Sequence, residues 1–372
     1  MRNNEEKNAI RIVNSFRLSL AGAAALLACI CLPAEAKDQS DKAEHYQQVN
    51  LVSDQPNVAM VHDTNLVNAW GISFSSTSPF WVSDNGTGKS TLYAVTNDAS
   101  GVTHVQPQSL VVNIPGEGTV TGQFFDGTGS FHGDIFVFAS EDGTISGWRA
   151  ALGTNAEVLV SRPSAVYKGI TRATNSTGAL MLAANFSEGR VDVYRTNLAL
   201  VAQYTDPGAP VDYAPFNVQN INGIIFVTFA KRDPVTQDDV AGPGNGLIDT
   251  LDPETGSFTR FATGSDAGGN LHDINSPWGL AVSPNGFGKH SDELLVGNFG
   301  SGTIMTFDSN GKFRGLLKGF HEGPIQIDGL WGLTFGNGGR AGTTDTLFFT
   351  AGPDDESHGL FGSLTPAHGN DK

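Results

Sequence analysis

Apolar runs of strand length recur along this chain, and each run ends in a turn rich in Gly, Asn or Asp. A second run with alternating apolar and polar positions follows several of them, as at residues 144–148 and 190–194. The six runs are spaced by 56, 45, 44, 69 and 53 residues when aligned on Trp81, Val137, Leu182, Phe226, Leu295 and Phe348. Repeats of this length built from short strands are typical of a β-propeller. We therefore predict an all-β fold, a six-bladed β-propeller with four strands in each blade.

A second repeated phrase, Trp-Gly-aliphatic, precedes several of these runs. It occurs as Trp70-Gly71-Ile72, Trp278-Gly279-Leu280 and Trp331-Gly332-Leu333, and in weaker form as Lys168-Gly169-Ile170. In a propeller the innermost strand of each blade lines the central channel, where neighbouring blades crowd together. Glycine allows close approach of two backbones there, and tryptophan can pack between adjacent sheets. The phrase therefore predicts the inner strands, with the tryptophans as blade-packing core residues.

Two blades depart from the regular pattern. Only residues 121–125 could form the inner strand of the second blade, and residues 231–245 form a long polar insertion in the fourth. If the 69-residue interval hides a degenerate repeat, the ring has seven blades instead. Because exposed sheet edges invite aggregation, the ring must close. We expect residues 47–52 to join the last blade as its closing strand, so that residues 46–366 form one domain followed by a flexible tail at 367–372.

The N-terminal segment has the pattern of a signal peptide. A basic start precedes an apolar stretch of about 15 residues and a small-x-small cleavage pattern that ends at Ala36. We predict a signal peptide at residues 1–36, a flexible segment at 37–45, and a secreted or periplasmic protein. A lipoprotein anchored at Cys29 is an alternative, although apolar residues follow this cysteine. Since Cys29 and Cys31 both lie in the segment to be removed, we expect no disulfide in the mature chain.

Acidic residues outnumber basic ones, 38 against 22, which gives a formal net charge of −16. An acidic chain repels phosphate backbones and anionic lipid, so nucleic acid and membrane surfaces are disfavoured as partners. Beyond the N-terminal segment, no apolar stretch approaches the length of a membrane-spanning helix. Cations and neutral ligands suit the net negative charge of the chain better than anionic partners do. We expect a monomer whose partner is a small molecule, a glycan or a protein.

Three parts of the sequence together resemble a known family. They are the Trp-Gly-Leu phrase, the turn at residues 296–302 and the opening at residues 65–71. Through these parts the chain resembles a family of exported bacterial proteins to which no activity is assigned. The resemblance covers nearly the whole mature chain. More distantly, the repeats resemble NHL-repeat propellers and the six-bladed lactonase and gluconolactonase group. The second resemblance implies the fold and says little about chemistry.

Two sets of loops are expected to open on one face of the ring. One set precedes the inner strands, and the other joins the second strand of each blade to the third. Function in propellers usually lies there, around the channel mouth, because loops can vary while the ring stays rigid. The predicted ligand-binding residues in these loops are Asp63, Asp84, Asn85, Glu141, Asp273 and Asp328.

Amide and carboxylate oxygens that converge on a channel suit a hard cation such as Ca²⁺, which takes six to eight oxygen ligands. The lactonase-like propellers hold a metal in such a ring, so the resemblance implies the same possibility here. Asn85, Asn185 and Asn298 occupy similar turn positions in three blades, and Asn185 and Asn298 are the candidate metal ligands. The alternative is that these residues are simply turn formers, because Asn side chains hydrogen-bond nearby backbone.

Two His-Asp pairs, at His62-Asp63 and His272-Asp273, stand shortly before a Trp-Gly phrase. A histidine beside a carboxylate can act as a general base or a metal ligand, which makes His62 and His272 the candidate catalytic residues. Adjacent side chains on a strand point to different sides, however, and the sequence assigns no third group to either pair.

We predict a ligand-binding or protein-binding module that uses its channel-mouth face, without a firm expectation of enzymatic activity. One alternative is a Ca²⁺-dependent hydrolase related to lactonases or esterases, in which oxygen ligands hold the ion and a histidine accepts a proton. The other is a structural protein of the envelope or matrix.

Overall fold

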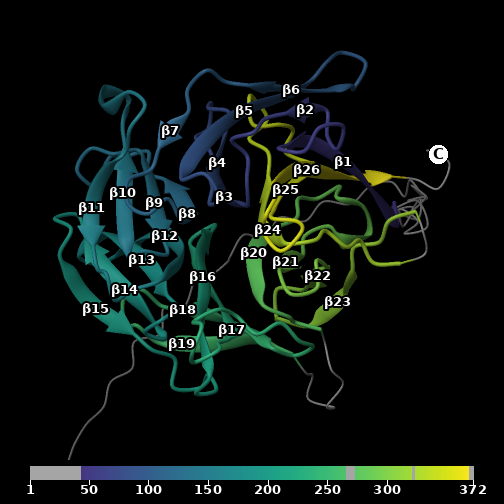
Figure 1. The fold of residues 1–372 in the computed structure, drawn as a ribbon. Helices are drawn as coiled ribbons and strands as arrows, with labels where there is room; N and C mark the ends of the chain where they lie inside the picture. The colour runs from purple at the N-terminus through teal and green to yellow at the C-terminus, as the bar shows by residue number, and fades with distance from the viewer. Residues whose placement is uncertain (1–42, 265–272, 321–322, 368–372) are drawn as a thin grey trace, which may run out of the picture. The chain divides into compact units, whose positions relative to one another are not determined.

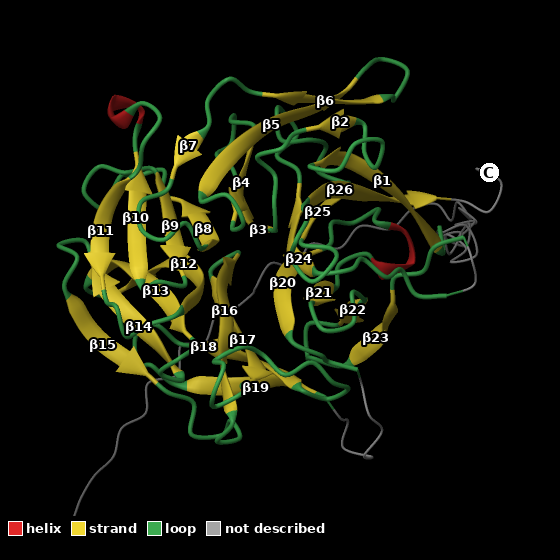
Figure 2. Ribbon diagram, in the orientation of Figure 1, coloured by secondary structure: helices red, strands yellow, loops and turns green. Residues whose placement is uncertain are grey.

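The computed structural model describes residues 43–264, 273–320 and 323–367. Within these residues the chain forms six antiparallel sheets that follow one another around a ring (Figure 1). Two single-turn 3-10 helices, at Ala150–Leu152 and Gly288–His290, are the helical elements of the described residues (Figure 2). The predicted six-bladed β-propeller is confirmed. The predicted signal peptide and the end of the C-terminal tail lie outside the described residues.

In the first five blades the strands are added in sequence order from the inside of the ring outward, whereas the outer strands of the sixth come from the N-terminal part of the domain. Blade 1 contains β3 (Ala69–Ser73), β4 (Phe80–Asp84), β5 (Lys89–Asn97) and β6 (Thr103–Pro107), and β7 (Val112–Asn113) also pairs with β5. Blade 2 contains β8 (Val120–Phe125), β9 (Phe136–Ser140), β10 (Thr144–Trp148) and β11 (Glu157–Ser161). Blade 3 contains β12 (Tyr167–Asn175), β13 (Gly178–Asn185), β14 (Arg190–Arg195) and β15 (Leu200–Tyr204).

Blade 4 contains β16 (Tyr213–Ile221), β17 (Ile224–Lys231), β18 (Gly246–Leu251) and β19 (Phe258–Thr263). Blade 5 contains β20 (Pro277–Val282), β21 (Leu294–Asn298), β22 (Ile304–Phe307) and β23 (Phe313–Leu316). Blade 6 contains β24 (Leu330–Phe335), β25 (Leu347–Ala351) and β26 (Leu360–Ala367). The 69-residue interval therefore contains no seventh sheet among the described residues, and the long connections between β17 and β18 and between β20 and β21 both add to its length.

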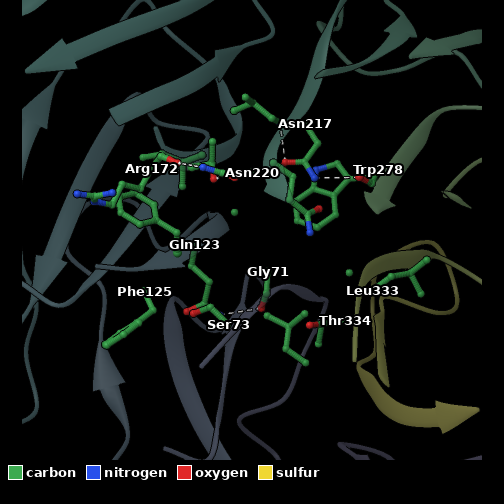
Figure 3. Close-up of a pocket in the computed structure, with 18 of the residues that line it drawn as sticks. Gly71, Ser73, Gln123, Phe125, Arg172, Asn217, Asn220, Trp278, Leu333 and Thr334 are labelled. Atoms are coloured by element: carbon green, nitrogen blue, oxygen red, sulfur yellow. Dashed lines mark hydrogen bonds between the residues drawn. The ribbon is translucent and has the colours of Figure 1, made fainter. Parts of the chain in front are cut away.

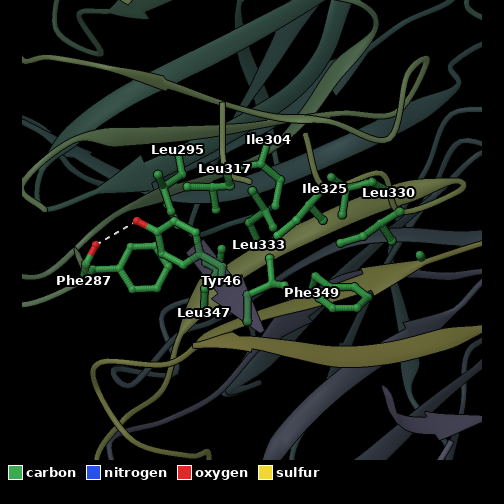
Figure 4. Packing of buried hydrophobic residues seen from close by; sticks show 14 of the residues in the cluster. Tyr46, Phe287, Leu295, Ile304, Leu317, Ile325, Leu330, Leu333, Leu347 and Phe349 are labelled. Carbon is green, nitrogen blue, oxygen red and sulfur yellow. Dashed lines mark hydrogen bonds between the residues drawn. The ribbon is translucent and has the colours of Figure 1, made fainter. Parts of the chain in front are cut away.

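The last blade is completed by the N-terminal part of the domain. Strand β1 (His45–Ser53) pairs antiparallel with β26, and β2 (Val61–His62) pairs in parallel with β1. Tyr46 of β1 is buried against blades 5 and 6, and its hydroxyl donates to the Phe287 carbonyl at 3.0 Å (Figure 4). The predicted closing strand is thus confirmed, and it covers a sheet edge that would otherwise be free to pair with another chain.

Neighbouring inner strands approach most closely at the glycine of the Trp-Gly phrase. A Cβ added to Gly71 would lie 2.5 Å from the Thr121 carbonyl oxygen, and one added to Gly279 would lie 2.3 Å from that of Trp331. Glycine is needed at both positions because backbone occupies the place of the side chain. The backbone of the next inner strand is met in the same way at Gly122, Gly169 and Gly332. The predicted reason for these glycines is therefore confirmed.

Blade 4 reaches its neighbour in a different way. Its inner strand β16 carries Phe216-Asn217 where the other blades carry a residue followed by glycine. The Asn217 side chain donates from Nδ2 to the Trp278 carbonyl at 2.8 Å and accepts at Oδ1 from the Val218 amide at 2.8 Å. A side-chain hydrogen bond thus joins blade 4 to blade 5.

The tryptophans of the phrase are buried core residues, as predicted, and they pack on one another at the centre of the ring. The ring centroids of Trp70 and Trp331 are 3.5 Å apart with the planes 22° from parallel. Trp278 meets Trp70 and Trp331 edge-on at 6.1 and 5.9 Å. Phe186 and Phe216 belong to the same cluster, which therefore fills the axis with aromatic side chains.

Candidate binding site at the channel mouth

Both predicted sets of loops lie at the same end of the inner strands. In every blade the first residue of the inner strand pairs with the last residue of the second strand, as Ala69 does with Asp84 and Tyr167 with Asn185. The loop before the inner strand and the loop after the second strand are therefore neighbours. We call this end of the ring the channel mouth.

Lys168 is the centre of a polar cluster at the channel mouth. The residue is only 5% exposed, and its Nζ donates to Glu141 Oε1 at 2.5 Å and lies 5.1 Å from the centre of the Trp70 ring. Burial alone would lower the pKa of Lys168, but the Glu141 carboxylate, together with Asp238 and Glu356, raises that pKa above its usual value. The site therefore contains a buried, positively charged ammonium group.

A series of side-chain hydrogen bonds connects this ammonium group to blade 6. Glu141 Oε2 accepts from Asn85 Nδ2 at 3.0 Å. Asn68 Nδ2 donates to Asn85 Oδ1 at 3.2 Å and to Glu356 Oε2 at 2.5 Å, while Asn68 Oδ1 accepts from Trp331 Nε1 at 3.1 Å. The series joins loops of blades 1, 2 and 6 and holds their polar groups in fixed orientations above the aromatic cluster.

The insertion in blade 4 contributes two more carboxylates, those of Asp238 and Asp239. The charges of Asp239 and Lys168 act on each other, and burial raises the pKa of Asp239 above its usual value in spite of the ammonium group. Burial likewise raises the pKa of Glu356, against the opposing hydrogen bond from Asn68 and the charge of Lys168. Asp239 Oδ2 is buried, and the Ser276 hydroxyl beside it acts to lower the pKa of this carboxyl group.

Four carboxylates therefore surround one ammonium group at the channel mouth. They belong to Glu141, Asp238, Asp239 and Glu356, none of which is fully buried. Phe299, half-buried, adds an aromatic face, because it stacks on Trp331 with 3.9 Å between ring centroids. The arrangement offers hydrogen-bond acceptors and negative charge at a rim that solvent can reach.

The structure brings two of the predicted ligand-binding residues, Asn85 and Glu141, together in this cluster. Asp63 and Asp84 lie elsewhere in blade 1. Asp63 accepts hydrogen bonds from Asn65 and from the Tyr93 hydroxyl, the latter at 3.0 Å. Asp84 is fully buried, and burial, with a contribution from the charge of Asp63, raises its pKa well above the usual value.

The other predicted residues are spread over the same face. Asp328 is exposed and accepts a hydrogen bond from the Asp354 amide at 2.9 Å, and Asp273 is exposed. The exposed ring of His62 contacts the Asp54 carbonyl at 2.8 Å through Nε2. His272 lies outside the described residues.

The candidate metal ligands hold local hydrogen bonds in their turns. Asn185 Nδ2 donates to Glu188 and Asp192, and its Oδ1 accepts from Ser187 and from the Glu188 amide. Asn298 Nδ2 donates to Thr303 Oγ1 at 3.1 Å. Its Oδ1 accepts from the backbone of the loop before β20. Asn185 thus bonds within its own turn, as the turn interpretation predicts, whereas Asn298 also joins its turn to the loop before β20.

The strand register corrects one predicted equivalence. Asn185 and Asn298 each pair with the first residue of their inner strand, and in blade 1 that position belongs to Asp84. Asn85 lies one residue further into its turn, where its side chain can reach the Glu141 loop of blade 2. Sequence alignment missed the offset because Asp and Asn are equally common in such turns.

One group of three potential metal ligands occurs among the described residues, away from the predicted metal ligands. It consists of His132, Asp134 and Glu157, whose ligand atoms lie within 4.8 Å of one another. The Arg149 guanidinium already lies within this group, with Nη1 at 2.8 Å from Asp134 Oδ1 and in contact with Glu157. An internal cation therefore already compensates these carboxylates.

Sequence reasoning did not select Lys168, Asp239 or Glu356 as the site residues. Lys168 was visible only as an odd residue in a weak Trp-Gly phrase, and Asp239 as part of a polar insertion. Lys168 is the one charged residue at a position that the other described inner strands fill with tryptophan, phenylalanine or threonine. This is a signal that could have found it, because a buried charge needs partners. No helix among the described residues has the length and apolar character to cross a membrane.

No protein-family model matches the sequence. The chain is 29% identical over 337 residues to an uncharacterised protein of Acanthamoeba polyphaga mimivirus, with 85% of each chain covered. A second uncharacterised protein of the same virus is 28% identical over 337 residues, covering 84% of this chain and 78% of that protein. Among solved structures, the apo form of the soluble aldose sugar dehydrogenase from Escherichia coli has a TM-score of 0.51 at 11% identity, covering 87% of this chain and 100% of that one. At this identity the likeness shows the fold alone.

Proposed function

We propose that the protein is a binding module whose channel mouth takes a ligand with a positively charged group. The observation that carries the proposal is the surplus of four carboxylates over one ammonium group around Lys168. The ammonium group is committed to Glu141, so it is poorly placed to attract an anion. The chain as a whole carries a net charge of −16, which adds to the attraction for cations.

The hydrogen-bond groups at the mouth support the same class of ligand. Asp239 Oδ2 is a buried acceptor with the Ser276 hydroxyl beside it, and burial raises the pKa values of Asp239 and Glu356. A cationic ligand would favour the ionised form of both carboxyl groups and would add a hydrogen-bond donor or a metal–oxygen bond. An organic ammonium group and Ca²⁺ share this chemistry.

We further propose that this binding takes place after export, because the N-terminal residues carry the pattern of a signal peptide ending at Ala36. The ligand would then be met in the periplasm or outside the cell, where Ca²⁺ and amines are both available to an acidic, soluble protein.

The test is a thermal unfolding assay with CaCl₂, with putrescine and with sodium acetate as the anionic control. A ligand at 100 times its Kd stabilises the native state by about 2.7 kcal/mol, which raises Tm by roughly 4 °C for a domain of this size. We expect the rise with one of the two cations and not with acetate. A chelator reverses the effect of Ca²⁺ and leaves that of putrescine unchanged, which separates the two sources.

Two variants locate the binding. Asp239→Asn and Glu356→Gln should each abolish the cation-dependent rise in Tm. Asp345→Asn, which removes the same charge from an exposed residue between β24 and β25, should retain it. Stabilisation by neither cation, or equal stabilisation of all three variants, would contradict the proposal.

A further inference from the structure

A cavity of about 380 Å³ opens at the end of the channel opposite the mouth (Figure 3). Residues from all six inner strands line it. In blade 5 the lining residue is Trp278, and in the other blades residues that follow the Trp-Gly position contribute. The buried cluster of Trp70, Trp331 and Phe216 lies between this cavity and the Lys168 cluster. The two ends of the channel therefore present separate sites with different surroundings.

The cavity wall contains two buried oxygen atoms without a hydrogen-bond partner among the described residues, Gln123 Oε1 and Ser73 Oγ. Gln123 is 8% exposed, and its Nε2 donates to the carbonyls of Gly71 and Trp81, both at 2.8 Å. These two bonds determine the orientation of the carboxamide, because the opposite orientation would place its oxygen against two carbonyl oxygens. Gln123 Oε1 is therefore held as a free acceptor, at a position where an unmade hydrogen bond is costly.

Apart from Arg172, the residues of the wall are uncharged. Arg172 is the charged residue of the lining, and its Nε lies 3.2 Å from Asp126 Oδ1, so its charge is already compensated. Phe124, Trp278 and Leu333 supply apolar surface. A charged ligand would lose its hydration here without gaining an opposite charge, whereas a neutral ligand with hydroxyl groups could donate to Gln123 and place its C–H groups on the apolar wall.

We propose that this cavity is a second binding site, for an uncharged small molecule rich in hydroxyl groups and of about the size of a monosaccharide. Its volume lies within the range of roughly 300–1,000 Å³ that is usual for small-molecule sites. The site is independent of the proposed cation site, because the aromatic cluster separates them and different residues line them.

The test is saturation-transfer NMR on the full chain with glycerol, D-glucose and D-galactose at millimolar concentration. Acetate and methylammonium serve as charged comparison compounds. We expect saturation transfer to at least one of the three hydroxyl compounds and to neither charged compound. Ser73→Ala removes a hydroxyl that makes no internal hydrogen bond, so the variant should fold, and it should weaken binding by about fivefold.

Ser83→Ala is the matched control, since Ser83 also has a buried hydroxyl without a described partner but does not line the cavity. It should bind as the unchanged protein does, as should Asp239→Asn at the opposite end of the channel. The proposal is overturned if none of the three hydroxyl compounds binds, or if Ser73→Ala binds them as well as Ser83→Ala does. If neither cation binds at the mouth but a hydroxyl compound binds in this cavity, only the proposed function is contradicted.

Discussion

Substitutions of Lys168 and Glu141 should have strongly non-additive effects on the free energy of unfolding. Glu141→Gln keeps the size of the side chain but leaves the ammonium group, only 5% exposed, without its nearest negative charge. Removing one partner of a fully buried pair costs about 3–5 kcal/mol. The Glu141 side chain is 25% exposed, and Asp238 and Glu356 remain near the ammonium group. We therefore expect a loss of about 2 kcal/mol, less than for a fully buried pair.

Lys168→Met should cost less, about 1 kcal/mol. It removes the charge together with the need for a partner, and the methionine side chain can remain on the rings of Trp70 and Phe186, which the ammonium group now faces at 5.1 and 5.9 Å. Glu141, which is partly exposed, can be hydrated once its partner is gone. The double variant should therefore be about as stable as Lys168→Met alone, with a coupling energy of about 2 kcal/mol.

The assay is thermal unfolding of the three variants, followed by tryptophan fluorescence. A propeller domain of this size has an unfolding entropy of roughly 0.7 kcal/mol/K, so a loss of about 2 kcal/mol lowers Tm by about 3 °C. The difference should persist at high salt, because a buried pair is screened little. Losses that add to within about 0.5 kcal/mol in the double variant would refute the reasoning, as would a larger loss for Lys168→Met than for Glu141→Gln.

Three further predictions concern the packing of the inner strands, the titration of Asp249 and the export of the protein. Gly279→Ala should lower Tm strongly or prevent folding, because its Cβ would lie 2.3 Å from the Trp331 carbonyl oxygen, whereas Gly339→Ala, at a loop position with its nearest neighbour at 3.4 Å, should change Tm little. Burial raises the pKa of Asp249 from 3.8 to about 7, so the folded state binds the carboxyl proton more tightly than the unfolded state does. The stability that this proton contributes is therefore lost as the pH rises from 3.8 to about 7. Urea unfolding should therefore show the unchanged protein losing stability relative to Asp249→Asn between those pH values, and a constant difference would contradict the assignment. Mass spectrometry of the exported protein should find Lys37 as the first residue, and a lipid-modified Cys29 at that end would favour the lipoprotein alternative.

Much of the fold could be predicted because propeller blades repeat a local pattern. The runs around Val137 and Leu182 became the second strands β9 and β13, and the glycines of the Trp-Gly phrase became the points of closest approach between blades. The inner strand of blade 4 escaped the pattern. Asn217 replaces the glycine there with a side-chain hydrogen bond to the Trp278 carbonyl, and such a substitution has no signature in the sequence.

The candidate site was only partly predictable, for a reason that concerns distance along the chain. The loops that carry it were identified, and two of their residues, Asn85 and Glu141, do meet. Lys168, Asp239 and Glu356 join them from blades 3, 4 and 6. Nothing in the local pattern around any one of them indicates the other two.

The sequence alone determined the class of fold and the strand that closes the ring, because these depend on apolar periodicity and turn residues that act over a few positions. It favoured six blades over seven, and the sheets of the structure decided for six. Only the tertiary structure decided which polar residues share a site. Burial next to Glu141 keeps Lys168 charged, and the two carbonyls that bind the Gln123 amide group leave its oxygen free in a cavity. Such properties arise from electrostatic and hydrogen-bond contacts between residues far apart in the chain, which exist only once the ring has closed.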